Sequence, residues 1–218
     1  MSATFKGSCT SGGGIACNAN TAVTWSGGPP ASTDSIVVFV YCTTAVDDFT
    51  GVTDSAGNTY TQDYSYLYAS AGHAVYRAAS ISGAPSWIRI GKTTTSNICF
   101  VASAYAGLST GAIESATQYT EGGNTVSHSI PYTTTASNDA VLMLYHGGND
   151  LGTPSALGSW NYIDGVRNAT DMFYLLDAGP AGSYNFTFTG PFFTVNMVRA
   201  VYQSAVTDPT VSTVSNPT

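Results

Sequence analysis

The feature that most constrains this chain is a series of short segments rich in β-branched and aromatic residues, separated by turns rich in Gly, Pro, Ser and Asn. The segments recur at roughly the ten-residue spacing that is typical of β-sandwiches and barrels. No window of a dozen residues has a clean 3.6-residue apolar period, so helices are not expected. The predicted strands are 21–25, 35–43, 49–53, 59–68, 74–79, 87–93, 97–105, 112–119, 125–133, 140–145, 160–166, 171–176, 184–189 and 193–202.

Three of these segments, 37–40, 99–101 and 141–144, are apolar on both faces of the pleat. Such strands lie in sheets that are covered on both sides, either within the chain or by a partner subunit. The segment around Trp87 and Arg89 alternates instead, which predicts a half-exposed strand. In 193–202 the alternation breaks near Met197, which predicts a bulge.

At 218 residues the chain has the length of one large all-β domain. We predict an all-β fold, a sandwich of two antiparallel sheets, formed by residues 1–205. Within it, residues 1–20 are Gly-rich, contain two cysteines and are predicted to form an N-terminal hairpin or arm. Residues 206–218 have two prolines and no aromatic anchor, which predicts a tail or linker. The sequence shows no internal repeat.

Charge excludes one large class of function. Only 9% of the residues are charged, and 13 acidic against 6 basic side chains give a formal net charge of −7. Nucleic-acid binding depends on Lys and Arg, so no nucleic-acid partner is expected. The longest apolar run, 36–42, is far shorter than the ~20 residues of a membrane-spanning helix, so no membrane insertion is expected.

The composition is typical of proteins that work outside the cell, being poor in Lys and Glu and rich in Thr, Ser, Gly and Tyr. Residues 1–7 have no apolar h-region, so no secretory signal is expected as the sequence stands. Either a leader was replaced by an initiator Met, or the protein reaches the outside on lysis, as phage components do. Both alternatives predict a location on a virion surface or in the extracellular space.

The four cysteines are Cys9, Cys17, Cys42 and Cys99. Cys9 and Cys17 flank a flexible Gly-rich segment that a disulfide could close, and the geometry of the fold decides whether they pair. Cys42 and Cys99 lie in apolar strands, where thiols behave as small hydrophobic groups, so a bridge between them is less favoured. No Cys-x-x-Cys occurs and the three histidines are scattered, so no zinc site is predicted.

The clearest turn signal is Thr53-Asp54-Ser55-Ala56-Gly57-Asn58-Thr59. An Asp at the start of a turn can accept hydrogen bonds from backbone N–H groups, and the Gly supplies the positive φ that closes a hairpin. A hairpin is therefore predicted here.

The order of several segments along the chain resembles that of a known family of domains. It runs through an apolar strand at 35–42, then Gly51-Val52-Thr53-Asp54-Ser55-Ala56-Gly57-Asn58-Thr59-Tyr60, then Ala74-Val75-Tyr76-Arg77, then Ala104-Tyr105-Ala106-Gly107-Leu108, and finally Asn138-Asp139-Ala140-Val141-Leu142. Over residues 20–204 this order resembles a family of β-sandwich domains found in bacterial exported proteins and in phage tail or head-surface proteins. The resemblance implies a jelly-roll-like sandwich with a surface or adhesion role, and it brings no catalytic pattern.

The motifs that would support catalysis are weak. Gly107-Leu108-Ser109-Thr110-Gly111 matches the Gly-x-Ser-x-Gly elbow of hydrolases, but no helix pattern follows it. A glycosidase needs two facing carboxylates, and the two glutamates, Glu114 and Glu121, would point to opposite faces of one strand. We therefore expect no enzymatic activity, no catalytic residue and no cofactor.

The one cluster of oxygen ligands is Asp47 and Asp48 with nearby Asp54 and Asn58. Clustered carboxylates and carbonyls favour Ca²⁺, but the spacing is not that of an EF-hand. Acidic residues in a solvated loop are the favoured interpretation, so no metal site is assigned.

Aromatic side chains are the best candidates for a recognition surface. Tyr64, Tyr66 and Tyr68 alternate along one strand and share a face, and Trp160 and Tyr162 do the same on another. Such rings stack on sugars or bury in subunit interfaces. The alternative is cross-strand aromatic packing inside a sheet, which needs no partner.

Two functions from different classes remain. The favoured one is a non-enzymatic structural protein of a phage or phage-like particle surface, of the decoration, head-fibre or tail-surface type. It would be a homo-oligomer or bind capsid or tail proteins, with the tail 206–218 adding a strand to a neighbour. The alternative is an extracellular carbohydrate-binding or adhesin domain of a secreted bacterial protein, with a cell-surface glycan as its partner.

Overall fold

The computed structural model describes residues 3–10, 17–18, 20–25, 30–42, 49–68, 71–93, 97–111, 113–122, 127–146, 157–166, 170–189 and 194–204. Within these ranges it has sixteen strands and no helix. They are β1 (Thr4–Thr10), β2 (Cys17–Asn18), β3 (Ala22–Thr24), β4 (Ser35–Cys42), β5 (Phe49–Asp54), β6 (Thr61–Tyr68), β7 (Ala71–Ala78), β8 (Trp87–Lys92), β9 (Asn97–Ala106), β10 (Ser115–Gly122), β11 (Ser127–Thr134), β12 (Ala140–His146), β13 (Asn161–Val166), β14 (Thr170–Leu175), β15 (Gly182–Thr189) and β16 (Thr194–Tyr202).

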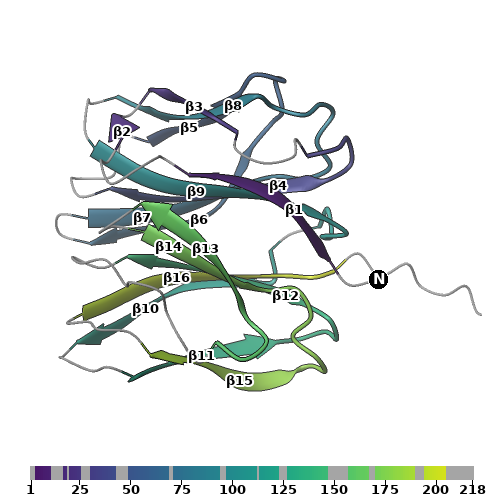
Figure 1. The fold of residues 1–218 in the computed structure, drawn as a ribbon, viewed down its shortest axis with the longest axis vertical. Helices are drawn as coiled ribbons and strands as arrows, with labels where there is room; N and C mark the ends of the chain where they lie inside the picture. Colours follow the sequence, from purple (N-terminus) through teal and green to yellow (C-terminus); the bar gives the residue numbers. More distant parts are fainter. Residues whose placement is uncertain are drawn as a thin grey trace, which may run out of the picture.

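The strands form four stacked layers, seen edge-on in Figure 1. The N-outer sheet has the order β3-β8-β5, and the N-inner sheet has the order β1-β9-β4-β7-β6, with β2 also paired to β9. The C-inner sheet has the order β10-β16-β12-β14-β13, and the C-outer sheet is the pair β11-β15. Because all pairings are antiparallel, the prediction of an all-β antiparallel sandwich is confirmed. The number of sheets is four rather than two.

Three apolar cores lie between the four layers, and the central strands contribute to two of them. On β4, Ile36 and Val38 point to the N-outer sheet, whereas Val37 and Phe39 point to the C-inner sheet. On β12, Leu142 packs in the central core and Met143 in the core beneath the C-outer sheet. The doubly apolar strands are therefore covered on both sides by their own chain, which was one of the two alternatives.

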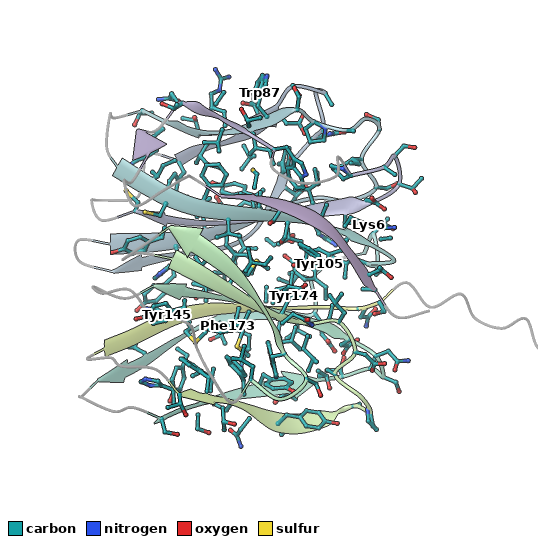
Figure 2. All side chains as sticks on the ribbon, in the orientation of Figure 1. Lys6, Trp87, Tyr105, Tyr145, Phe173 and Tyr174 are labelled. Atoms are coloured by element: carbon teal, nitrogen blue, oxygen red, sulfur yellow. The ribbon has the colours of Figure 1, made fainter. Side chains whose placement is uncertain are left out.

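The central core joins the two inner sheets through aromatic side chains. The Tyr105 ring on β9 meets the Tyr174 ring on β14 edge to face, with centroids 6.1 Å apart. Phe5 of β1 stacks on Tyr174 at 5.0 Å and contacts Tyr105 at 5.9 Å. Figure 2 shows Tyr105 and Tyr174 between the inner sheets and Tyr145 with Phe173 one layer further. Offset and edge-to-face pairs of this kind add stability beyond area burial, which ties the halves together.

The order of strands repeats. The seven strands β1, β3, β4, β6, β7, β8 and β9 have the same order and pairing as β10, β11, β12, β13, β14, β15 and β16. In each set, five of these strands form an inner sheet and two lie in the outer layer. Strands β2 and β5 are additional in the first set, and the corresponding stretches of the second set, 123–126 and 147–156, lie outside the described residues. The expectation of no internal repeat was therefore wrong at the level of topology: the molecule is one sandwich unit present twice, inner sheet against inner sheet.

A short sequence signature accompanies the repeat. Ala31-Ser32-Thr33-Asp34 precedes β4 and Ala136-Ser137-Asn138-Asp139 precedes β12. In both turns the Asp Oδ2 accepts a hydrogen bond from the N–H of the Ala, at 2.8 Å and 3.1 Å. Both residues before the Asp have positive φ, 81° for Thr33 and 63° for Asn138. The same turn thus starts the central strand of each unit.

Every predicted strand is present, with ends that differ by a few residues. The differences concern two strands that were not predicted and a predicted bulge. Two strands were missed, β1 and β2, both of which pair with β9. The described part of this segment therefore contributes two strands to one edge of the N-inner sheet, and these two strands pair with β9 rather than with each other as a hairpin. The bulge expected near Met197 is also absent, because β16 pairs in continuous register on both sides. Its alternation breaks because both of its faces are buried.

The turn at Asp54 is not a hairpin. It leads from β5 in the N-outer sheet to β6 in the N-inner sheet, and these two strands pair with different partners. The local chemistry was nevertheless predicted correctly. Asp54 Oδ1 accepts hydrogen bonds from the N–H groups of Ala56 and Asn58, and Gly57 has a φ of 74°. The signal specified a tight turn but not which strands flank it.

Candidate functional site

An aromatic platform lies on the outward face of the N-outer sheet. On β8, Ile88 and Ile90 point into the core, so Trp87 and Arg89 point outward. The guanidinium carbon of Arg89 lies 5.9 Å from the Trp87 ring centroid, and Arg89 Nε donates to Thr53 Oγ1 at 3.2 Å. Figure 2 shows Trp87 at the outer limit of the stack. These three residues, Trp87, Arg89 and Thr53, form what we call the tryptophan platform.

The tryptophan platform offers a flat apolar ring beside a fixed cation and a hydroxyl group. A ring of this kind stacks on the C–H face of a sugar, while a guanidinium donates to hydroxyl or carboxylate oxygens. The sequence analysis predicted the half-exposed strand correctly but did not select Trp87 as a recognition residue. The signal was present, since the same alternation that buries Ile88 and Ile90 exposes Trp87.

The exposed face of the C-outer sheet, at the opposite end of the stack, is a regular array of small polar side chains. On β11 every second residue is buried, with Ile130 and Tyr132 in the core. The residues between them point outward together with those of β15. They are Ser127, Ser129, Pro131, Thr133, Ser183, Asn185, Thr187 and Thr189. Across the pair, Thr133 Oγ1 and Ser183 Oγ lie 3.2 Å apart. This set of outward residues, which we call the hydroxyl face, carries no ionisable side chain.

The predicted tyrosine face on β6 is only partly exposed. Tyr64 is half-buried against the central core, where its hydroxyl is hydrogen-bonded to the backbone of Gln118, and burial raises its pKa. Tyr66 is 36% exposed at the free edge of the N-inner sheet. The side chain of Tyr68 lies outside the described residues. Within this set Tyr66 is the side chain available to a partner.

The other aromatic candidate, Trp160, belongs to a core. Its ring packs against Phe186, with centroids 4.3 Å apart, and meets Tyr132 edge to face at 5.6 Å. These partners are on β15 and β11, so the ring closes one side of the core beneath the C-outer sheet. The side chain of Tyr162 lies outside the described residues. For Trp160 the interpretation as aromatic packing, which needs no partner, agrees with the structure.

The predicted oxygen cluster near Asp54 serves the turn. Asp54 Oδ2 accepts from Asn58 Nδ2 at 2.8 Å and from the Tyr60 hydroxyl at 2.9 Å. Burial, and then the charge of Asp54, raise the pKa of Tyr60, so the phenol stays a donor. Asn58 also donates to the carbonyl of Gly83 and accepts from the N–H of Ser82. The carboxylate that was considered for Ca²⁺ is thus already saturated by donors.

The remaining members of that cluster, Asp47 and Asp48, lie outside the described residues. Among the residues that the structure does describe, no group of three or more His, Cys, Asp or Glu side chains could hold a metal ion. A shallow open pocket of about 210 Å³ lies next to the turn and is lined by residues 57–59 and 78–82. Its walls carry no charged side chain.

A buried ion pair lies between the inner sheets. Arg77 Nε on β7 is 3.1 Å from Asp63 Oδ2 on β6, and the two side chains are 6% and 5% exposed. The hydroxyl of Tyr202 also donates to Asp63, at 3.0 Å, and the Arg77 guanidinium lies 5.3 Å from the Tyr202 ring centroid. Asp63 is the extra residue at a break in the β6–β7 register, which turns its side chain inward. The ion pair therefore joins sheets and offers nothing to solvent.

The described residues of the two candidate catalytic motifs make structural contacts. Ser109 Oγ accepts from the N–H of Gly111 at 3.1 Å, and its carbonyl accepts from Arg77 Nη1 at 3.0 Å. No helix follows it, so the geometry of a nucleophile elbow is absent at this serine. Glu114 binds the backbone N–H of Thr135 at 2.7 Å, and the side chain of Glu121 lies outside the described residues.

The cysteines lie on different faces. Cys9 is buried in the core beneath the N-outer sheet, and the side chain of Cys17 lies outside the described residues, so their pairing stays a prediction. Cys42 points into the same core as Cys9, whereas Cys99 points into the central core. Because Cys42 and Cys99 point to opposite faces of one sheet, they cannot bridge to each other.

Comparison with known proteins adds no relative: no family model, no curated protein and no solved structure matches the chain. A search of the described residues finds no helix with the length and apolar character needed to cross a membrane. Function is therefore inferred from the exposed faces of the outer sheets and from the buried side chains beneath them.

Proposed function

We propose that this protein is a non-enzymatic structural component of the surface of a phage or phage-like particle, which contacts neighbouring subunits through its exposed outer faces. The observation that carries the proposal is the hydroxyl face of the C-outer sheet, backed by a fully packed core. Its outward residues carry no ionisable side chain, so a neighbour could dock on this face without burying a charge.

The titratable groups support the same proposal. Asp34, Asp54 and Asp139 each accept hydrogen bonds from backbone N–H groups in turns, and Asp63 is paired with Arg77. Turn and core chemistry explains these acids without any reaction. The partners we propose are copies of this chain or capsid and tail proteins, and the location is the virion surface.

The internal packing changes the form that self-association would take. The doubly apolar strands are covered within the chain, so an oligomer is not needed to bury them. Subunit contacts would instead use the outer faces or the free edge at Tyr66, where an added strand gains backbone hydrogen bonds. The proposed strand donor, residues 206–218, lies outside the described residues.

The experiment combines electron microscopy of the native source material with substitution of one face at a time. Ser129→Lys with Thr187→Lys places two charges at a cross-strand pair of the hydroxyl face. We expect this variant to fold and to lose its place in the particle, while Thr24→Lys on the N-outer sheet keeps it. Normal incorporation of both variants, or copies with no regular arrangement, would refute the proposal.

The tryptophan platform favours a second candidate, an extracellular carbohydrate-binding or adhesin domain. A half-exposed Trp beside a fixed Arg is the arrangement that stacks on and hydrogen-bonds a sugar. Isothermal titration with oligosaccharides tests this directly. Binding that Trp87→Ala abolishes and Thr187→Ala leaves intact would favour the second candidate over the first. The absence of binding across a broad glycan panel would exclude it.

A further inference from the structure

Two carboxyl groups meet at the corner where the C-inner sheet meets the C-outer sheet. Glu114 precedes β10, and its N–H donates to the carbonyl of Val201 on β16 at 3.0 Å. Asp139 precedes β12, and its carbonyl accepts from the N–H of Ala178 at 3.0 Å. The backbone thus fixes both residues before their side chains interact.

The side chains bind successive N–H groups of one turn. Glu114 Oε1 accepts from Thr135 N at 2.7 Å, and Asp139 Oδ2 accepts from Ala136 N at 3.1 Å. The other two oxygens, Glu114 Oε2 and Asp139 Oδ1, are both buried and accept no hydrogen bond from another group in the described part of the chain. The two carboxyl groups are, however, within hydrogen-bonding reach of each other.

Two ionised carboxylates in this position would repel each other and leave two buried oxygens unsatisfied. One proton between Glu114 and Asp139 removes both problems. We propose that these two carboxyl groups share a single proton, and that its release loosens the corner joining the start of β10 to the β11–β12 turn. The corner is then a pH-operated latch in the C-terminal unit.

The electrostatics of the site agree with this. Burial, followed by the hydrogen bond and charge of Asp139, raises the pKa of Glu114 to about 7, although the N–H of Thr135 acts in the opposite direction.

Charged and titratable groups on the neighbouring elements are occupied elsewhere. Arg199, on β16, donates to the carbonyl of Pro131, and burial lowers its pKa. Asp177, in the turn that contacts Asp139, accepts from the N–H of Gly179 at 3.1 Å. On β11 and β15, burial raises the pKa of Tyr132, and the hydroxyl of Tyr184 donates to the carbonyl of Pro180.

The repeat supplies a matched control. Asp34 makes the same turn contact in the N-terminal unit as Asp139 makes in the C-terminal unit. Residues 1–10, which contain the strand equivalent to β10, include no acidic residue. The proposed latch is therefore specific to one half of a pseudo-symmetric molecule.

The sign of the pH effect follows from linkage. The folded protein holds the shared proton up to about pH 7, whereas an unfolded Glu releases its proton near its ordinary pKa of 4.5. The folded state thus binds more protons between these values, so this pair's contribution to stability is full below about pH 4.5 and falls as pH rises to about 7. Buried His73, with its pKa lowered to about 4, gives the opposite slope, so variants must be compared by difference.

The decisive experiment is a carbon-13 NMR titration of the side-chain carboxyl groups in the full-length protein. We expect the Glu114 carboxyl carbon to titrate with a midpoint near 7. A midpoint near 4.5, as for an ordinary Glu, would overturn the proposal even if no variant folds.

Melting temperatures from pH 5 to 8 give an independent measurement. In wild type, the carboxyl pair should lower the melting temperature as pH rises. This contribution should be absent in Glu114→Gln and present in Asp34→Asn. The protection factors of the Thr135 and Ala136 amides, which correct for the base-catalysed rise of the intrinsic exchange rate, should fall above pH 7 in wild type only. Equal pH slopes in wild type and Glu114→Gln would also refute the latch.

Discussion

Breaking the buried ion pair between the inner sheets should be one of the most damaging single changes to this fold. Asp63→Asn keeps the shape of the side chain and an acceptor for Tyr202, but it removes the charge that compensates Arg77. The Arg77 side chain is only 6% exposed, so water cannot replace that charge. Removing one partner of a buried pair costs about 3–5 kcal/mol, because the other charge stays buried and uncompensated.

For a chain of this length, 1 kcal/mol corresponds to roughly 2–4 °C in melting temperature, so Asp63→Asn should lower it by about 6–20 °C. Urea unfolding at pH 7, followed by circular dichroism, measures the free energy. The double variant Asp63→Asn with Arg77→Met removes both charges and should recover most of the loss, because well-packed apolar replacements of buried pairs are often neutral.

The double-mutant cycle also tests the reasoning. A coupling energy of about 2–4 kcal/mol between Asp63 and Arg77 is expected, since the two atoms lie 3.1 Å apart in a buried site. If Asp63→Asn costs less than about 1 kcal/mol, the pair is exposed to water and the description of the central layer is wrong. If the double variant loses more free energy of unfolding than the two single variants lose together, the description of the central layer is also wrong.

Three further predictions concern the turn, the pH response and the outer core. Asp54→Ala removes the acceptor for two backbone N–H groups, for the Asn58 side chain and for the Tyr60 hydroxyl, so it should lower the free energy of unfolding in urea by about 2–4 kcal/mol. The control Asp177→Ala, in an exposed turn, should lower it by less than about 1 kcal/mol. Burial lowers the pKa of His73 to about 4, so as pH falls the unfolded state binds a proton at this residue before the folded state does. Stability should therefore decline as pH falls from about 6.5 to 4. In acid titrations of unfolding, His73→Phe should reduce that decline. Trp160→Ala should lower the melting temperature by several degrees because the ring lies in a core, and an unchanged melting curve would mean that it is a surface residue.

Much of the fold was predictable because strand signals are local. The alternation around Trp87 predicted which side of β8 is exposed, and the apolar faces of 37–40 predicted coverage on both sides. What covers those faces was not predictable, since β4 and β12 contact layers formed by distant residues. The same limit explains the error at Asp54, where the turn residues specify local geometry and not the sheet that follows.

The site was predicted less well than the fold. Tyr64, Tyr66 and Tyr68 were assigned to one face by alternation, but alternation says nothing about what lies opposite, and Tyr64 meets the C-inner sheet. Asp63 could not be placed from sequence, because the irregularity beside it shifts the register. For Trp160 the sequence left recognition and aromatic packing open, because its neighbours in sequence do not reveal the aromatic partners that reach it from β11 and β15.

The repeat was not visible in the sequence because the two units share strand order and the pattern of buried positions, whereas most of their residues differ in identity. Ala31-Ser32-Thr33-Asp34 and its counterpart at 136–139 are short, and the buried positions accept many apolar residues. Tyr105 and Tyr202 occupy equivalent places at the ends of β9 and β16, paired with Ser35 and Ala140, yet their neighbours differ.

The arrangement of the two units, inner sheet against inner sheet, is the geometry of a symmetric dimer joined into one polypeptide. In a dimer of identical subunits every substitution appears twice, on both sides of the axis. Two units within one polypeptide can differ residue by residue, and here Glu114 precedes β10 whereas residues 1–10, which contain the equivalent strand β1, include no acidic residue. The two ends of the stack therefore differ, one with the tryptophan platform and the other with the hydroxyl face, so a neighbouring molecule can distinguish one end from the other.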